Sequence, residues 1–336
     1  MKNTTRFFLF LLLLLLFAGA FVFDLTGLDI SALQLLDLLK GAPSDGSPVN
    51  DIVTQIRLPK AITAILCGAG LSVAGLLMQT LFRNPLAGPY VLGISSGAGL
   101  GVALVVMGAS FVPFLNEYGA VSQVVAATLG ALLVLMLVLL VSTRIHDTVS
   151  LLIIGMMLGS LTGAIVNVLQ TFSNPDALKV YIMWTMGSLA NVSNQQLGLM
   201  VPPMLVGFLL AILIQKPLNA LLLGENYARS MGVSVRFIQT VIILTTCLLA
   251  GVSTAFTGPI AFIGIAVPHI VRGLFNSSDH RIVLPASILF GATLLLVCDI
   301  VSCLPHYSLP INSMCAVVGA PIIIWVIIKN KKIQQG

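Results

Sequence analysis

The segment RNPLAGPYVLGISSGAGLG (residues 83–101) separates two long apolar runs and decides how the chain can be built. It contains two prolines and five glycines, whereas the flanking sequence consists almost wholly of Leu, Val, Ile and Ala. Pro85 and Pro89 lack a backbone donor and prevent a regular helix. The segment therefore predicts a bend between two apolar helices, near the cytoplasmic face, where a gate could form.

Composition places the chain in a membrane. Of its 336 residues 58% are hydrophobic and only 8% are charged, against about 25% charged in a soluble domain. A helix needs roughly 20 apolar residues to cross the hydrocarbon layer. We expect one all-α polytopic membrane domain over residues 1–336, with ten spans near 7–23, 58–81, 91–109, 118–141, 149–171, 195–215, 236–256, 259–275, 282–303 and 310–328.

The basic residues orient these spans. With a cytoplasmic amino terminus, ten spans return the carboxyl terminus to the cytoplasm, twelve basic residues lie inside, and four lie outside: Lys40, Arg57, Lys60 and Lys179. This positive-inside bias favours cytoplasmic termini. It also accounts for the net charge of +5 without nucleic-acid binding. The first span is interpreted as an uncleaved anchor rather than a signal peptide.

Two outer segments carry further helical patterns. Residues 28–40 have the spacing of an amphipathic helix at the membrane interface, and residues 172–194 contain YIMWTMGSL, which predicts a short helix. The five cysteines form no C-x-x-C pair, so neither a zinc site nor a disulfide framework is indicated.

A short motif occurs twice. AGLSVA (69–74) and AGVSTA (250–255) are each followed by Gly-Pro and then Gly-Ile. Five spans separate the copies, so they would cross the membrane in opposite directions, as in the inverted repeats of transporters. We expect a first repeat over 58–171 and a second over 236–328. The alternative is that small residues recur wherever helices pack closely.

Other chemistries have weaker support. GISSG (93–97) satisfies the G-x-S-x-G pattern of a hydrolase, with Ser95 as nucleophile and His269 as base, but that motif needs a strand before it. An ion-coupled carrier would need intramembrane carboxylates, and the expected spans contain essentially one, Asp299. The chain has no phosphate-binding loop, so if ATP drives transport a separate subunit must hydrolyse it.

Four stretches resemble one family, the FecCD permeases of ABC importers. They are RLPKAITAILCGAGLSVAGLLMQTLFRNPLAGPYVLGISSGAGLG (57–101), LLLGENYARSMGVSV (221–235), GPIAFIGIAVPHIVRGLFNSSDHRIVLPASILFGATLLLVCDIVS (258–302) and LPINSMCAVVGAPIIIWVII (309–328). The resemblance implies a ten-helix subunit in the bacterial inner membrane. It implies a dimer with a second copy or a paralogue, two ATPase subunits inside that use the ATP, and a periplasmic or lipid-anchored substrate-binding protein outside. The expected substrate is a ferric siderophore, otherwise haem or cobalamin; the chain itself would bind no cofactor or metal and catalyse no reaction.

The resemblance also assigns roles to residues. The inner gate maps onto Asn84, Pro85, Leu86 and Thr148, and the pair that docks the binding protein maps onto Arg57 and Lys60. The segment 216–236 would contact the ATPase as two short helices joined at a glycine, with leucines exposed for the partner. Its expected coupling residues are Leu218, Leu221, Leu222, Gly224, Glu225, Ala228 and Gly232.

The chain departs from the family pattern near its last span. Ser308 and Asn312 replace the Glu and Gly of a Glu-Leu-Pro-Ile-Gly motif, and Cys315 stands where a Thr is usual. Cys303 occupies the place of an outer basic residue. These changes bear on the substrate and on docking.

Overall fold

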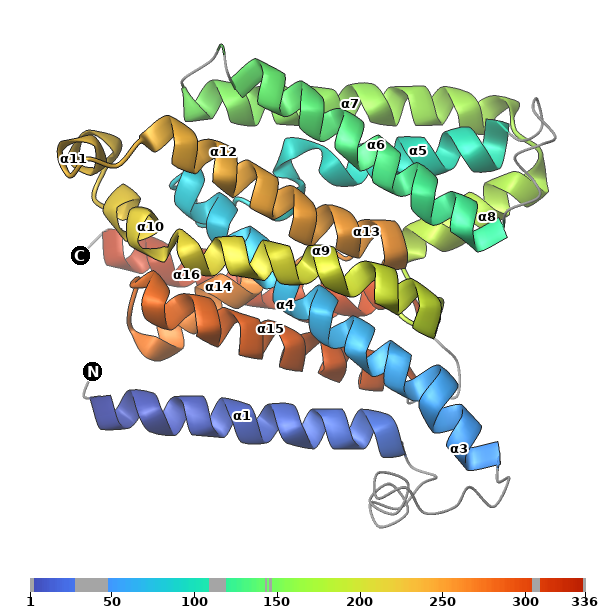
Figure 1. Cartoon of the computed structure of the whole chain (residues 1–336), viewed down its shortest axis with the longest axis horizontal. Helices are drawn as coiled ribbons and strands as arrows, with labels where there is room; N and C mark the ends of the chain where they lie inside the picture. Colours follow the sequence, from blue (N-terminus) through green and yellow to red (C-terminus); the bar gives the residue numbers. More distant parts are fainter. Residues whose placement is uncertain are drawn as a thin grey trace.

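A computed structural model describes residues 3–27, 48–108, 119–142, 144, 147–303 and 309–334, and every regular element in them is a helix (Figure 1). The all-α prediction is therefore confirmed. The amphipathic helix expected over 28–40 and the departure at Ser308 lie outside the described residues. In chain order the elements are α1 (Asn3–Thr26), α3 (Pro48–Ile52), η1 (Val53–Arg57), α4 (Leu58–Leu81), η2 (Pro89–Leu92), α5 (Ile94–Gly108), α6 (Gly119–Ser142), α7 (Thr148–Phe172), α8 (Pro175–Met186), α9 (Asn194–Leu213), α10 (Gln215–Leu222), α11 (Glu225–Ser230), α12 (Val235–Thr246), η4 (Cys247–Gly251), α13 (Val252–Thr257), α14 (Ile263–Phe275), α15 (His280–Cys303) and α16 (Ile311–Gln334).

Each of the ten expected spans coincides with a helix, but not all are full length. Among the described residues seven helices are long and apolar enough to cross a membrane, and three shorter apolar helices complete the ten: Ile94–Gly108, Ile263–Phe275 and Ile311–Ile324. The short helices α5 and α14 each begin after a residue with left-handed backbone, Gly93 (φ 76°) and Phe262 (φ 69°). A left-handed residue cannot continue a helix, so the spans predicted at 91–109 and 259–275 start late. The short helix expected within 172–194 is α8.

Helix α4 lies at the centre of the bundle. It packs against α9, α12, α14 and α15, and nearly all of it is buried. Small residues allow the close approach: a Cβ placed on Gly75 would lie 1.7 Å from the carbonyl oxygen of Gly264, and one on Gly68 would lie 2.3 Å from that of Gly291. The Ser72 hydroxyl donates to the carbonyl of Ser287 at 2.7 Å. Glycine contacts and interhelical hydrogen bonds are how helices associate where lipid gives no hydrophobic drive.

The two halves of the chain pack reciprocally. Helix α4 of the first half packs on α15 of the second, and α12, η4 and α13 of the second half pack on α6 of the first. After Gly93 the short helix α5 is followed by the long helices α6 and α7, and after Phe262 the short helix α14 is followed by the long helices α15 and α16. The inverted repeat over 58–171 and 236–328 stays a prediction.

The two ends of the bundle differ in content. Both chain termini lie at one end, together with α10, α11 and the connection from α14 to α15, while α3 and α8 lie at the other (Figure 1). Helix α1 packs along α15, and its Phe10 lies against Phe275 of α14 at 4.7 Å between ring centroids. The end with the termini is called the inner end below, and the opposite end the outer end.

Candidate functional site

The predicted bend is present directly after α4. Arg83 adopts a left-handed conformation (φ 47°), and the Asn84 side-chain oxygen accepts the backbone N–H of Leu86 at 2.9 Å. The Asn84 carbonyl accepts the N–H of Ala87 at 3.1 Å, which closes a tight turn. Asn84, Pro85 and Leu86 are exposed, and Leu86 keeps 43% of its surface accessible. The bend therefore presents an apolar side chain at the inner end.

Thr148, the other expected gate residue, begins α7. Asp147 caps this helix by accepting from the backbone N–H of Ser150 at 2.8 Å and of Val149 at 3.4 Å. The Ser150 hydroxyl also donates to this carboxylate, and these hydrogen bonds hold the pKa of Asp147 below its ordinary value. The cap fixes where α7 starts, and with it the backbone position of Thr148. η2, which follows the bend, packs on α7.

The segment 216–236 folds as two short helices, α10 and α11, joined at a glycine, as the sequence predicts. Gly224 has φ 123° and Gly232 has φ 79°, both in the region that favours glycine. At the end of α11 the N–H of Val233 bonds to the carbonyl of Ala228 and that of Gly232 to Arg229, each at 3.0 Å. This pair of bonds with a left-handed glycine is a Schellman cap. We call residues 215–232 the knob.

The prediction that the knob's leucines are exposed is wrong for two of them. Leu218 and Leu221 are buried, at 0% and 4% exposure, because α10 packs on α4 and α15. Ala228 is buried as well. The exposed apolar side chains of the knob are instead Leu222, Leu223, Tyr227 and Met231. Leu218 and Leu221 therefore attach the knob to the bundle, and a partner would meet the other set.

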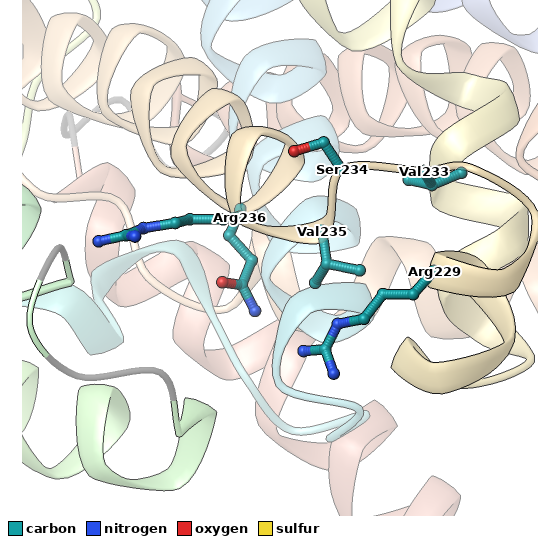
Figure 2. Close-up of a pocket in the computed structure, with 6 residues that line it drawn as sticks. Arg229, Val233, Ser234, Val235 and Arg236 are labelled. Atoms are coloured by element: carbon teal, nitrogen blue, oxygen red, sulfur yellow. The ribbon is translucent and has the colours of Figure 1, made fainter.

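A basic pocket adjoins the knob. It has a volume of about 340 Å³ and is lined by Arg229, Val233, Ser234, Val235, Arg236 and Gln239. Figure 2 shows Arg229 reaching from α11 and Arg236 from the start of α12, with Val235 between them. Arg229 also pairs with Glu225 at 3.0 Å, one helical turn away. Glu225 is thus engaged within the chain, through a surface pair of little energetic weight.

The expected docking pair makes contacts inside the chain. Lys60 Nζ lies 2.7 Å from Asp299 Oδ2 and 3.3 Å from Cys303 Sγ, and its side chain is 18% exposed. Arg57 Nη1 donates to the carbonyls of Leu25 and Thr26 at the carboxyl end of α1. A cation there satisfies carbonyls that have no helical partner. Sequence reasoning gave both residues a docking role and missed these fold-stabilising contacts.

Asp24 is a further charged residue that sequence reasoning missed. It lies in the last turn of α1, and its carboxyl group is close to that of Asp299 and to the charges of Lys60 and Arg57. Asp24 directly follows the expected span 7–23, and a carboxylate at the end of a span could have indicated a charged contact there. The outer ends of α1, α4 and α15 are thus joined by one cluster of charged groups, which we call the outer charge cluster: Asp24, Arg57, Lys60 and Asp299.

Three of the departures from the family pattern have structural explanations. The Asn312 side chain accepts the N–H of Ala261 at 3.0 Å and so stabilises the irregular segment before α14. Cys303 lies 3.3 Å from Lys60 Nζ, and Cys315 is buried close to Cys298.

The hydrolase reading loses its structural context. Ser95 lies in the first turn of α5, and the residues before it form the short 3-10 segment η2, not a strand. No strand occurs in the part of the chain that the structure describes. The nucleophile elbow that G-x-S-x-G denotes requires a strand and then a helix.

Comparison with known proteins decides the family. The sequence model of the FecCD transport family matches residues 8–329. The chain belongs to the FecCD transport family. Among its relatives is the vitamin B12 import system permease protein BtuC of Salmonella typhimurium, 38% identical over 284 residues, which cover 83% of this chain and 84% of the relative. The BtuC protein of Klebsiella pneumoniae is 38% identical over 283 residues, covering 83% of each chain.

Solved structures agree with this FecCD assignment. A structure described as the inward-facing conformation of a metal-chelate type ABC transporter superposes with a TM-score of 0.83 at 29% identity, covering 94% of this chain and 97% of the other. PsaBC from Streptococcus pneumoniae, in complex with Fab, shares the fold at a TM-score of 0.57 and 18% identity, over 80% and 90% of the two chains. As a FecCD protein the chain is the membrane permease of an ABC importer and not an enzyme; a separate subunit hydrolyses ATP. This assignment excludes the alternative of a hydrolase with Ser95 and His269. It also excludes the alternative of an ion-coupled carrier, because an ABC importer is driven by ATP.

Proposed function

We propose that this permease imports a metal chelate across a bacterial inner membrane: a corrinoid, a ferric siderophore or haem. The observation that carries the proposal is the family match over residues 8–329. The relatives named as vitamin B12 permeases make the corrinoid the first substrate to test, whereas the family resemblance alone led us to expect a siderophore. The relative described as a metal-chelate type transporter is compatible with all three.

We infer the orientation from charge. Arg83, Arg229, Arg236, Arg272 and Arg281 all belong to turns or helix ends at the inner end of the bundle (Figure 1). Cytoplasmic loops carry the excess of Lys and Arg, so the inner end and both termini face the cytoplasm. The outer end then meets the substrate-binding protein, and two ATPase subunits serve a pair of permease subunits from inside.

The gate and the knob take the roles that the family resemblance implies. Exposed Leu86 of one subunit, together with Thr148, would close the path against the facing subunit by apolar contact. The ATPase would cover Leu222, Leu223, Tyr227 and Met231, since an exposed apolar group at a cytoplasmic surface is a typical protein contact. The pocket lined by Arg229 and Arg236 would receive an acidic side chain of the same partner.

Transport in proteoliposomes tests the substrate. The permease is reconstituted with its ATPase and binding protein, and uptake of cyanocobalamin, ferrichrome and haemin is measured with and without ATP. We expect ATP-dependent uptake of one of the three. Uptake that continues without ATP hydrolysis would contradict the proposal, and so would ATP hydrolysis that none of the three chelates stimulates.

Two exposed leucines test the knob. Changing Leu222 and Leu223 together to Asp should reduce co-purification of the ATPase at least about tenfold, because an interface depends on a few buried anchors. The matched control is Leu274→Asp in the last turn of α14, since Leu274 and Leu222 are 43% and 40% exposed. If the double variant still retains the ATPase, the knob is not the contact.

A further inference from the structure

Three polar side chains connect the knob to the start of the gate segment. Asn219 lies in α10, His280 is the first residue of α15, and Thr80 lies in the last turn of α4. His280 Nδ1 lies 2.8 Å from Asn219 Oδ1, and His280 Nε2 lies 2.9 Å from Thr80 Oγ1. His280 and Thr80 are buried, at 0% and 2% exposure. A histidine buried between three helices needs partners for both ring nitrogens, and here it has them.

The hydrogen positions in this path follow from its exposed end. Asn219 Nδ2 lies 2.6 Å from Asp279 Oδ1, and an ionised carboxylate can only accept, so the amide nitrogen faces Asp279. The amide oxygen then faces His280 and accepts from its backbone N–H at 2.8 Å and from its Nδ1–H. In the neutral ring Nε2 is left as an acceptor and faces the Thr80 hydroxyl, which also lies 2.9 Å from the Leu76 carbonyl of its own helix. The polar contacts therefore form a continuous path from Thr80 through His280 to Asn219 and Asp279.

The residue before Thr80 fixes the same turn of α4 to the neighbouring helix. Gln79 accepts from the Arg272 guanidinium of α14, and its amide donates to the carbonyl of Ile265 at 3.1 Å. The backbone N–H of Asn84 donates to the Gln79 carbonyl at 3.2 Å. Residues 83–88, the gate segment, thus follow directly on a turn of α4 that is bonded to α14 through Gln79 and to His280 through Thr80.

We propose that Asn219, His280 and Thr80 are the positioning residues that transmit movement of α10 to residues 83–88. The proposal rests on the coupling role of the knob given above. Moving α10 away from α4 would leave buried donors and acceptors unpaired, so the helices move together instead of separating. The close glycine contacts of α4 with α14 and α15 make α4 follow as a rigid body. A purely structural alternative is that Asn219 only caps α15.

The test uses the permease–ATPase complex with a probe in the gate. A thiol-reactive fluorophore is attached at Leu86→Cys, a position that is already exposed, and the same protein without this change gives the background. The measured quantity is the change in fluorophore quenching when ATP is added. Thr80→Val is the deciding variant, because it replaces one hydroxyl by a methyl group of equal size. Thr63→Val is its matched control, since Thr63 is also buried in α4 but donates only to Pro59 of its own helix.

We expect Thr80→Val and Asn219→Ala to reduce the ATP-dependent change at least about fivefold, the lower range of allosteric coupling, while the ATPase still co-purifies. Thr63→Val should stay within about twofold of the parent. The Thr80→Val, Asn219→Ala double variant should reduce the response no more than the stronger of the two single variants, as expected of residues on one path. An unreduced response in Thr80→Val overturns the proposal. If the Leu222 and Leu223 double variant keeps its ATPase, the coupling role of the knob is wrong, and this inference, which rests on it, is wrong as well.

Discussion

The α4–α15 pair is joined differently at its two ends. At the outer end Lys60 and Asp299 form an ion pair at 2.7 Å, with Asp24 and Arg57 beside it. At the inner end Thr80 and His280 meet at 2.9 Å in a chain of hydrogen bonds that leads to α10. Midway, Ser72 bonds to the Ser287 carbonyl and Gly68 touches Gly291. The same two helices thus carry charge at one end and hydrogen-bonded polar groups at the other.

The difference indicates which end can move. Separating a buried ion pair leaves an uncompensated charge, which costs about 3–5 kcal/mol. Exchanging a hydrogen bond between uncharged groups changes stability by only about 0.5–1.5 kcal/mol. The outer end is therefore the more strongly joined end of the pair, and the inner end, where α10, α4 and α15 are hydrogen-bonded to one another, can move as one unit relative to it. Three substitutions test this comparison.

The largest expected effect is at the outer end. Asp299→Ala removes the nearest partner of the mostly buried Lys60 and leaves it only Asp24 as an acidic neighbour. It should lower the free energy of unfolding by about 3 kcal/mol, the low end for a broken buried pair, seen as a reduced melting temperature in detergent. Replacing both partners, as Lys60→Met with Asp299→Leu, should recover most of that loss. Lys179→Glu, on exposed α8 at the same end, should change little. If the Lys60→Met, Asp299→Leu variant is as unstable as Asp299→Ala, the ion pair is not what joins α4 to α15 at the outer end.

The middle of the bundle comes next. Gly75→Ala places a methyl group on the backbone of Gly264 and should destabilise the protein by about 1–3 kcal/mol, as overpacking does. Gly163 in α7 has open space around it, so Gly163→Ala should instead raise the melting temperature slightly through helix propensity. If both variants melt alike, the close approach of α4 and α14 does not hold the bundle.

The smallest effect is at the inner end and depends on pH. The backbone N–H of Arg281 and the amide of Asn219 hold the pKa of Asp279 below its ordinary value of 3.8. A carboxyl group whose pKa is lower in the folded state contributes stability above the ordinary pKa, and this contribution is lost as the pH falls below 3.8 through the folded-state pKa. Asp279→Asn should therefore melt lower than the parent at pH 7, and the two melting curves should converge below about pH 3.8. A difference that persists at low pH would assign the effect to packing.

The sequence predicted local features well and distant contacts poorly. Pro85 and Pro89 predict the bend after α4, and Gly224 and Gly232 predict the knob, because each acts on its own backbone. Leu218 and Leu221 show that one face of α10 is covered, but a periodic pattern does not say whether the bundle or a partner covers it. The pairing of Lys60 with Asp299 joins positions more than 200 residues apart, and neither residue's neighbours indicate the other.

The central position of α4 has a consequence for biosynthesis. Its hydrogen-bond partners in α15 follow Thr80, Ser72 and Lys60 by 200, 215 and 243 residues. At a translation rate of about 5–20 residues per second, α4 leaves the ribosome some 10–50 seconds before α15. During that time Lys60, Ser72 and Thr80 lack their hydrogen-bond partners in α15. Nascent α4 therefore depends on the insertion machinery, or on an early partner such as α9, to shield these groups until synthesis of α15 is complete.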